Sequence, residues 1–129
     1  MANLNGKWSY RSFRSGTKDA PPEIAVPWAP PGEFVAATDA TGKITGTMRF
    51  APGVELTVNG SITPAAGHLW WHRPEGIELT AEGLSAVYNL QGYFIDDDHV
   101  VGTVVGVRND LAKQPDGTNG PFALFKTGP

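Results

Sequence analysis

The chain contains no cysteine among its 129 residues. This absence excludes disulfides, thiol nucleophiles and cysteine-ligated metals, and it is typical of a reducing compartment. We therefore predict a cytoplasmic protein, or a secreted one if a signal peptide has been removed. No apolar run approaches the roughly 18 residues of a membrane-spanning helix, so we expect no membrane partner. The formal net charge is -3 and basic residues are sparse, so nucleic acid is not an expected partner.

Helical periodicity is also lacking, because no stretch of about a dozen residues repeats apolar side chains at i, i+3, i+4 and i+7. Instead, 16 glycines and 11 prolines separate short segments in which apolar and polar residues alternate, the pattern of β-strands. The segments predicted as strands are 6–14, 33–38, 43–50, 54–63, 75–83, 86–95, 99–108 and 120–126. Short turns join most of them. The sequence therefore predicts a single all-β domain over residues 1–129, an eight-stranded up-and-down antiparallel β-barrel.

Two connections are too long to be hairpin turns. The first is the proline-rich insertion 15–32, which holds Trp28 and five of the eleven prolines, and the second is 109–119. Because the loops of an up-and-down barrel alternate between its ends, both connections should lie at the same rim. Long ordered loops in a compact domain are usually functional, so we expect a ligand to enter at this rim.

Four segments resemble the avidin and streptavidin family, in the same order along the chain. They are LNGKWSY at 4–10, TGKITGT at 41–47, GYFIDDDHVVGTVVGVRND at 92–110 and FALFK at 122–126. Each resembles a strand or strand–turn–strand region of that family. The resemblance implies an avidin-like barrel, or the barrel of a close calycin relative.

The biotin-binding residues of that family are not matched. The family binds the ureido oxygen of biotin with an asparagine, a tyrosine and a serine, and the positions here that match the first two hold Tyr10 and Met48. A binding-site tryptophan of the penultimate strand corresponds to Val105, and the tryptophan that a neighbouring subunit contributes has no counterpart in KQPDGTNG at 113–120. Because buried hydrogen-bond donors fix such a ligand, we predict no tight biotin binding.

Alternation predicts which side chains line the barrel interior. The side chains predicted to point inward are Trp8, Tyr10, Met48, Phe50, Tyr88, Leu90, Val105 and Val107. A slip of one residue would replace Tyr88 and Leu90 by Asn89 and Gln91. The candidate ligand-binding residues are Tyr10, Arg14, Trp28, Met48, Phe50, Tyr88, Val105 and Asn109. An eight-stranded barrel holds at most one small ligand, and a fully packed core is the alternative.

The favoured function is the binding of a small, largely apolar molecule at the open rim, without a cofactor. Arg14 and Asn109 would orient a polar group of that ligand. The alternative is an isomerase or cyclase in which Tyr10, Arg14 or an inward glutamate transfers protons. Glu55 and Glu78 would form a buried carboxylate pair only if their strands turned the other face inward, and we expect both to face solvent. A third alternative is an oligomeric interaction protein with a filled core. No catalytic residue is assigned.

The stretch HLWWHRPEG at 68–76 joins the fourth and fifth predicted strands at the far rim. Trp70 and Trp71 are therefore expected to plug the barrel end or to contact a subunit, rather than to cover a ligand site. A hairpin turn at Asn59–Gly60 would add a strand and move both tryptophans to the open rim.

No metal site is predicted, although two histidine motifs were considered. His68 and His72 are four residues apart, but the proline and glycine beside them exclude the helix that would align their rings. The stretch DDDH at 96–99 lies in a predicted turn, where acidic side chains are usually solvated.

The strand HVVGTVVGVR at 99–108 is apolar on both faces. With Val101, Val105 and Val107 taken as inward, Val100 and Val104 remain on the outer face, together with two glycines that permit close approach. Exposed valines would be an aggregation hazard unless another subunit covered them. The sequence therefore predicts self-association, as a dimer or tetramer, through the Val100–Arg108 strand.

Overall fold

The computed structural model describes residues 1–14, 26–27, 31–51, 53–110 and 116–129, and within these ranges it contains eleven β-strands and no helix. The strands are β1 (Gly6–Arg14), β2 (Val26–Pro27), β3 (Gly32–Thr38), β4 (Lys43–Ala51), β5 (Val54–Thr63), β6 (Ala66–His68), β7 (Trp71–Arg73), β8 (Gly76–Glu82), β9 (Ala86–Asp96), β10 (His99–Asn109) and β11 (Asn119–Gly128). No described helix has the length and apolar character needed to cross a membrane.

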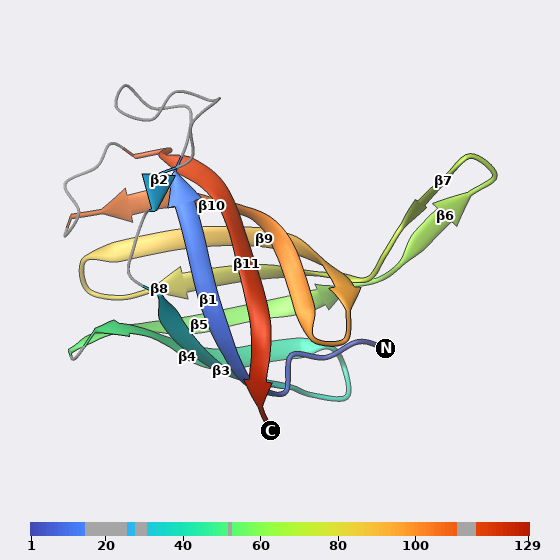
Figure 1. Cartoon of the computed structure of the whole chain (residues 1–129), viewed down its shortest axis with the longest axis horizontal. Coiled ribbons are helices and arrows are strands. Elements are labelled where there is room, and N and C mark those ends of the chain that lie inside the picture. Colours follow the sequence, from blue (N-terminus) through green and yellow to red (C-terminus); the bar gives the residue numbers. More distant parts are fainter. Residues whose placement is uncertain (15–25, 28–30, 52, 111–115) are drawn as a thin grey trace.

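Eight of the strands close into an antiparallel barrel (Figure 1). Their order is β11-β10-β9-β8-β5-β4-β3-β1, and a β11–β1 pairing completes the ring. Each barrel strand corresponds to one predicted strand, so the predicted eight-stranded antiparallel β-barrel is confirmed. The short strand β2 adds to the end of β1, and β6 pairs with β7 in a separate hairpin.

The strand β5 runs without interruption through Asn59 and Gly60. Asn59 pairs with Thr45 of β4 on one side and with Thr80 of β8 on the other. The hairpin considered at Asn59–Gly60 is therefore absent, and the extra strand pair lies further along the chain, in the β6–β7 hairpin.

Every barrel strand contributes apolar side chains to one core. A central row of the core runs from Trp8 to Phe34, Met48 and Leu56 on successive strands. The Trp8 indole is fully buried, and its Nε1 donates a hydrogen bond to the Leu4 carbonyl oxygen at 2.9 Å. The middle of the barrel is thus occupied by packed side chains.

The inward face of β10 is the opposite of the predicted one. Val100 and Val104 are buried in the core, whereas Val101 and Val107 are 41% and 45% exposed, and Val105 lies on their outer face. Alternation could not choose between the faces because both are apolar. Pairing with β9 sets Gly92 opposite Gly102, and the ring of Phe122 fills the barrel interior beside Gly92. The face of β10 that carries Gly102 is therefore the inward one. A Cβ at Gly92 would lie 2.9 Å from Cζ of Phe122.

The described ends of the two long connections lie together, as predicted. The start of β11 approaches the end of β1, since a Cβ at Gly120 would lie 2.8 Å from Cα of Arg14. At the same end, the amide of Asp110 donates to the carbonyl oxygen of Ser85 at 2.8 Å. We call this end the open end. The opposite end, from which the β6–β7 hairpin extends, is the far end (Figure 1).

Candidate functional site

Three aromatic rings gather inside the open end of the barrel, and they come from β1, β4 and β11. The ring of Tyr10 meets Phe50 edge-on, with 5.6 Å between centroids and 73° between planes. It stacks on Phe122 at 6.0 Å and 30°. Tyr10 is only 4% exposed, whereas Phe50 is half-buried. Aromatic pairs of this kind hold one another in fixed orientations.

The backbone explains why these rings meet. Tyr10 pairs with Gly32 on β3 and with Leu124 on β11. Because Gly32 has no side chain, the ring of Phe50 lies across it, and a Cβ there would come within 2.9 Å of Cδ1 and Cε1 of Phe50. Phe50 therefore lies at the mouth of the barrel, two residues along β4 from Met48 of the central row.

Hydroxyl groups accompany the rings. Ser12, two residues along the inward face from Tyr10, is buried, and so is Thr118. Burial raises the pKa of the Tyr10 phenol above its usual value, the hydrogen bond to Ser12 lowers it by less, and the nearby Tyr88 raises it further. The phenol is therefore neutral at physiological pH and acts in hydrogen bonding rather than as a base.

A hollow of about 550 Å³ opens beside Phe50 at the rim. It is lined by Pro31, Gly32, Glu33, Arg49, Phe50, Gly53 and Glu55. Arg49 and Glu55 are cross-strand neighbours at its outer edge, and Nε of Arg49 donates to Oε1 of Glu55 at 2.8 Å. The hollow thus joins an apolar floor, the half-buried ring of Phe50, to a charged outer edge.

The structure brings three of the predicted site residues together at the open end, namely Tyr10, Phe50 and the half-buried Tyr88, which packs against the core. Met48 lies one layer deeper, in the buried central row. Arg14 is the last residue of β1 and is half-buried.

The other predicted site residues are not placed there. Trp28 and the side chain of Asn109 lie outside the described residues, although the backbone of Asn109 pairs with Ala86. Val105 was expected inside the barrel, and this is wrong: its side chain is on the outer face of β10, for the reason given above. Ser12 and Phe122 were not among the predicted site residues. Alternation from Tyr10 already points to Ser12, but Phe122 emerges only from the β1–β11 register.

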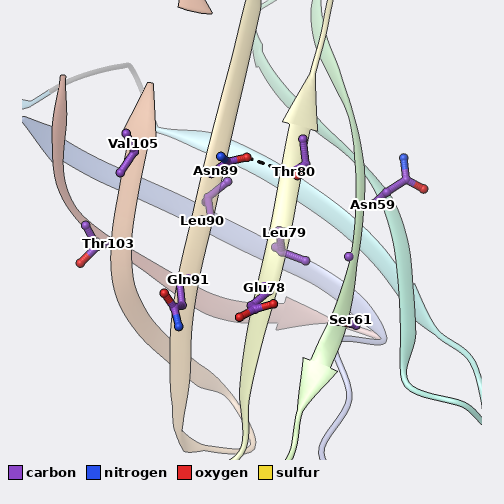
Figure 2. A pocket seen from close by; sticks show the side chains of 11 residues that line it. Asn59, Ser61, Glu78, Leu79, Thr80, Asn89, Leu90, Gln91, Thr103 and Val105 are labelled. Carbon is purple, nitrogen blue, oxygen red and sulfur yellow. Dashed lines mark hydrogen bonds between the residues drawn. The ribbon is translucent and has the colours of Figure 1, made fainter. Parts of the chain in front are cut away.

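Val105 instead lines a hollow of about 500 Å³ on the outer surface of β5, β8, β9 and β10 (Figure 2). Polar side chains form two rows across these strands: Asn59, Thr80 and Asn89 in one, and Ser61, Glu78, Gln91 and Thr103 in the other. Oγ1 of Thr80 and Oδ1 of Asn89 are 3.3 Å apart. This surface was not predicted from the sequence, although its residues alternate regularly with core residues.

General acid–base groups are not buried in the described part of the barrel. The buried polar side chains there are Ser12 and Thr118, whereas Glu55 and Glu78 face solvent, as expected. Among the described residues, no three histidine, aspartate or glutamate side chains come together as a metal site would require. Nδ1 of His99 lies 2.7 Å from Oδ1 of Asp96, and this hydrogen bond lowers the pKa of the exposed Asp96 carboxyl.

The tryptophans of the sequence HLWWHRPEG do not plug the barrel. Leu69 and Trp70 form the turn of the β6–β7 hairpin and are 85% and 88% exposed. Trp71 is exposed as well, and its ring stacks on His68 at 6.5 Å. His72 pairs with Gly67, so it projects from the other face of the hairpin and does not align with His68.

Comparisons with known proteins add no relative from which residue roles could be transferred, because no protein-family model, curated protein or solved structure matches the chain.

Proposed function

We propose that the protein binds a small, largely apolar molecule at the open end of the barrel. The observation that carries this proposal is the position of Phe50. One side of its ring packs on Tyr10, and the residue also lines the rim hollow. A half-buried aromatic ring beside a hollow of about 550 Å³ offers apolar surface to a ligand without opening the core. The ligand would lie at the mouth, because packed side chains fill the middle of the barrel.

The charged edge of the hollow would give this site its specificity, because Arg49 and Glu55 line the hollow together with Phe50. Tyr10 and Ser12 form a hydrogen-bonded pair on the core side of Phe50, where water has little access, and support the ring from there. A ligand with one polar group among apolar ones would contact both the ring of Phe50 and the charged edge. Arg14 at the rim, together with Trp28 and Asn109, remains part of the proposal, whereas Val105 no longer belongs to it.

The described residues support binding over catalysis. An isomerase or cyclase would need a buried acid or base, and the described interior offers hydroxyls but no carboxylate or imidazole. Tyr10 holds its proton too tightly to act as a general base near neutral pH. Binding therefore requires only groups that the described interior provides, whereas catalysis would also require a buried acid or base.

We also propose that the chain self-associates through the outer face of β10. In the structure that face consists of Val101, Thr103, Val105 and Val107, whereas Val100 and Val104, which were predicted to lie there, are buried. Exposed apolar side chains on a paired strand support a contact with another subunit. An avidin-like relationship agrees with the barrel topology, and the absence of cysteine supports a reducing compartment such as the cytoplasm.

Titration with the neutral fluorescent probe N-phenyl-1-naphthylamine tests the binding site. We expect the wild-type protein to take up one probe per chain, and Phe50→Ala to weaken this uptake by about tenfold or more, because the apolar floor is lost. Val35→Ala is the control, since Val35 is an exposed apolar residue on the outer face of β3. Equal affinities of all three proteins, or no uptake by the wild type, would contradict the proposal.

A further inference from the structure

The β6–β7 hairpin, residues 66–73, forms an arm that extends away from the barrel (Figure 1). Its tip carries Leu69, Trp70 and Trp71, all of them exposed. The base of the arm is held by Nη2 of Arg73, which donates to the carbonyl oxygen of Pro64 at 3.1 Å. The arm therefore presents large apolar side chains on an ordered support, although no described part of the same chain covers them.

A second apolar surface lies at the same end, on the outer face of β9, β10 and β11. We call it the patch, and it consists of Tyr93, Ile95, Val101, Ala123 and Phe125. Tyr93, Val101 and Ala123 are direct neighbours in the register, and Phe125 pairs with His99. Ile95 is 66% exposed, and Val101 and Phe125 are also exposed. The patch thus continues the apolar outer face of β10 toward the far end.

The charges around the arm and the patch are complementary. Within residues 66–73 the ionisable side chains are His68, His72 and Arg73, and none is acidic. The patch is bordered by the turn Asp96–Asp98, with Arg11 at its opposite margin beside Ala123. An arm with basic flanks and an apolar tip therefore fits the part of the apolar surface that the Asp96–Asp98 turn borders, away from Arg11.

We infer that the arm of one chain packs on the patch of a second copy of the chain, and that the exchange is reciprocal. Its three-residue strands give the arm a length of roughly 10 Å, at about 3.4 Å per residue, and the side chains of the turn project beyond it. Its two tryptophans and leucine would bury roughly 500 Å² and about as much of the patch, so two exchanged arms bury roughly 2,000 Å², the size of a stable dimer interface. This inference rests on the self-association proposed above but not on the ligand site.

Crosslinking tests whether the arm meets the patch. Because the chain has no cysteine, single cysteines can be introduced without side reactions. Isotopically labelled Leu69→Cys protein is mixed with unlabelled Val101→Cys protein and treated with bismaleimidoethane. We expect the mixed pair to crosslink at least tenfold more than Leu69→Cys mixed with Thr47→Cys, whose cysteine lies on the polar outer face of β4. Crosslinking no greater than this control, or confined to two labelled chains, would overturn the inference.

Sedimentation velocity separates this inference from the broader proposal of self-association. We expect the wild type to be a dimer or a multiple of it, and both Trp70→Ser/Trp71→Ser and Val101→Ser/Phe125→Ser to raise the dissociation constant at least 100-fold. Leu84→Ser is the control, because Leu84 is an exposed apolar residue at the open end. If the patch variant dissociates but the arm variant does not, self-association stands and the arm inference falls.

Two further outcomes would also count against the arm inference. A wild type that stays monomeric removes both proposals of assembly. If that monomer binds vesicles of phosphatidylserine and phosphatidylcholine, and Trp70→Ser/Trp71→Ser abolishes the binding, the arm inserts into lipid instead of packing on a second copy.

Discussion

The two ends of the barrel use aromatic side chains in opposite ways. At the open end, Tyr10 is buried between Phe50 and Phe122 on long strands that have neighbours on both sides. At the far end, Trp70 and Trp71 belong to an arm of two three-residue strands, and no third described strand flanks it. The comparison shows that an aromatic ring serves the fold where its strand is flanked on both sides and its side chain points inward, and that it remains available to a partner where either condition fails.

The largest effect should come from comparing two tryptophans. We expect Trp8→Ala to lower the free energy of unfolding by about 3–5 kcal/mol, because it empties the central row of the core. Trp70→Ala should change it by less than about 0.5 kcal/mol in protein dilute enough to be dissociated, since the side chain is exposed. Urea denaturation followed by circular dichroism measures both. Similar losses in the two variants would contradict the assigned difference between the barrel core and the arm.

A smaller effect should follow from filling the space that Phe122 occupies. In the Gly92→Val variant the new side chain would collide with the ring of Phe122 and with the Val101 carbonyl, so we expect a loss of about 1–3 kcal/mol in unfolding free energy. Gly53→Val is the comparison within the same barrel, because no atom lies within 4 Å of a Cβ there, although its φ of 79° adds strain. If Gly92→Val is no more destabilising than Gly53→Val, the inward assignment of this row is wrong.

The phenol of Tyr10 should make the stability of the protein sensitive to alkali. Its pKa is raised in the folded state, mainly by burial, so its contribution is complete below the unfolded value of 10.0 and is lost as the pH rises from there toward the folded pKa. Tyr10→Phe should remove this part of the alkaline loss and cost about 1 kcal/mol at neutral pH, since Ser12 loses its partner. Tyr93→Phe, on the outer face, is the control. Equal alkaline profiles for wild type and Tyr10→Phe would contradict a buried phenol.

The smallest expected effect is no effect at all. We expect calorimetric titration of the wild type with biotin to give no measurable heat, because the sequence resemblance puts Tyr10 and Met48 in place of the asparagine and the tyrosine that bind biotin in the avidin family. Nanomolar binding would show that the open end uses a different set of donors from the one described here.

Much of the fold follows from local pattern, and the failures have physical causes. Regular alternation of apolar and polar residues, in segments bounded by glycines and turns, identified all eight barrel strands, because each strand has one core face and one solvent face. Alternation failed in β10, where valines occupy both faces and the choice depends on Gly92 of the neighbouring strand. It also missed the arm, because three-residue strands that are exposed on both faces have no hydrophobic period.

The candidate site, like the fold, was predictable where alternation within one strand determines it, and not where the pairing of distant strands determines it. Tyr10 and Phe50 were found because both alternate with polar residues on their own strands. The contact of Tyr10 with Phe122 joins residues more than a hundred positions apart, and it is set by the β1–β11 register. No periodicity within one strand contains that information, so this part of the site had to come from the structure.

Native mass spectrometry of the protein as purified tests the central claim, that the open end holds a small molecule, most directly. The account predicts an oligomer that carries one additional mass of a few hundred daltons per chain, released on activation, together with an oligomer of Phe50→Ala that has lost it. Wild-type and Phe50→Ala proteins with the same spectrum, whether both bare or both loaded, would contradict a ligand site at the open end.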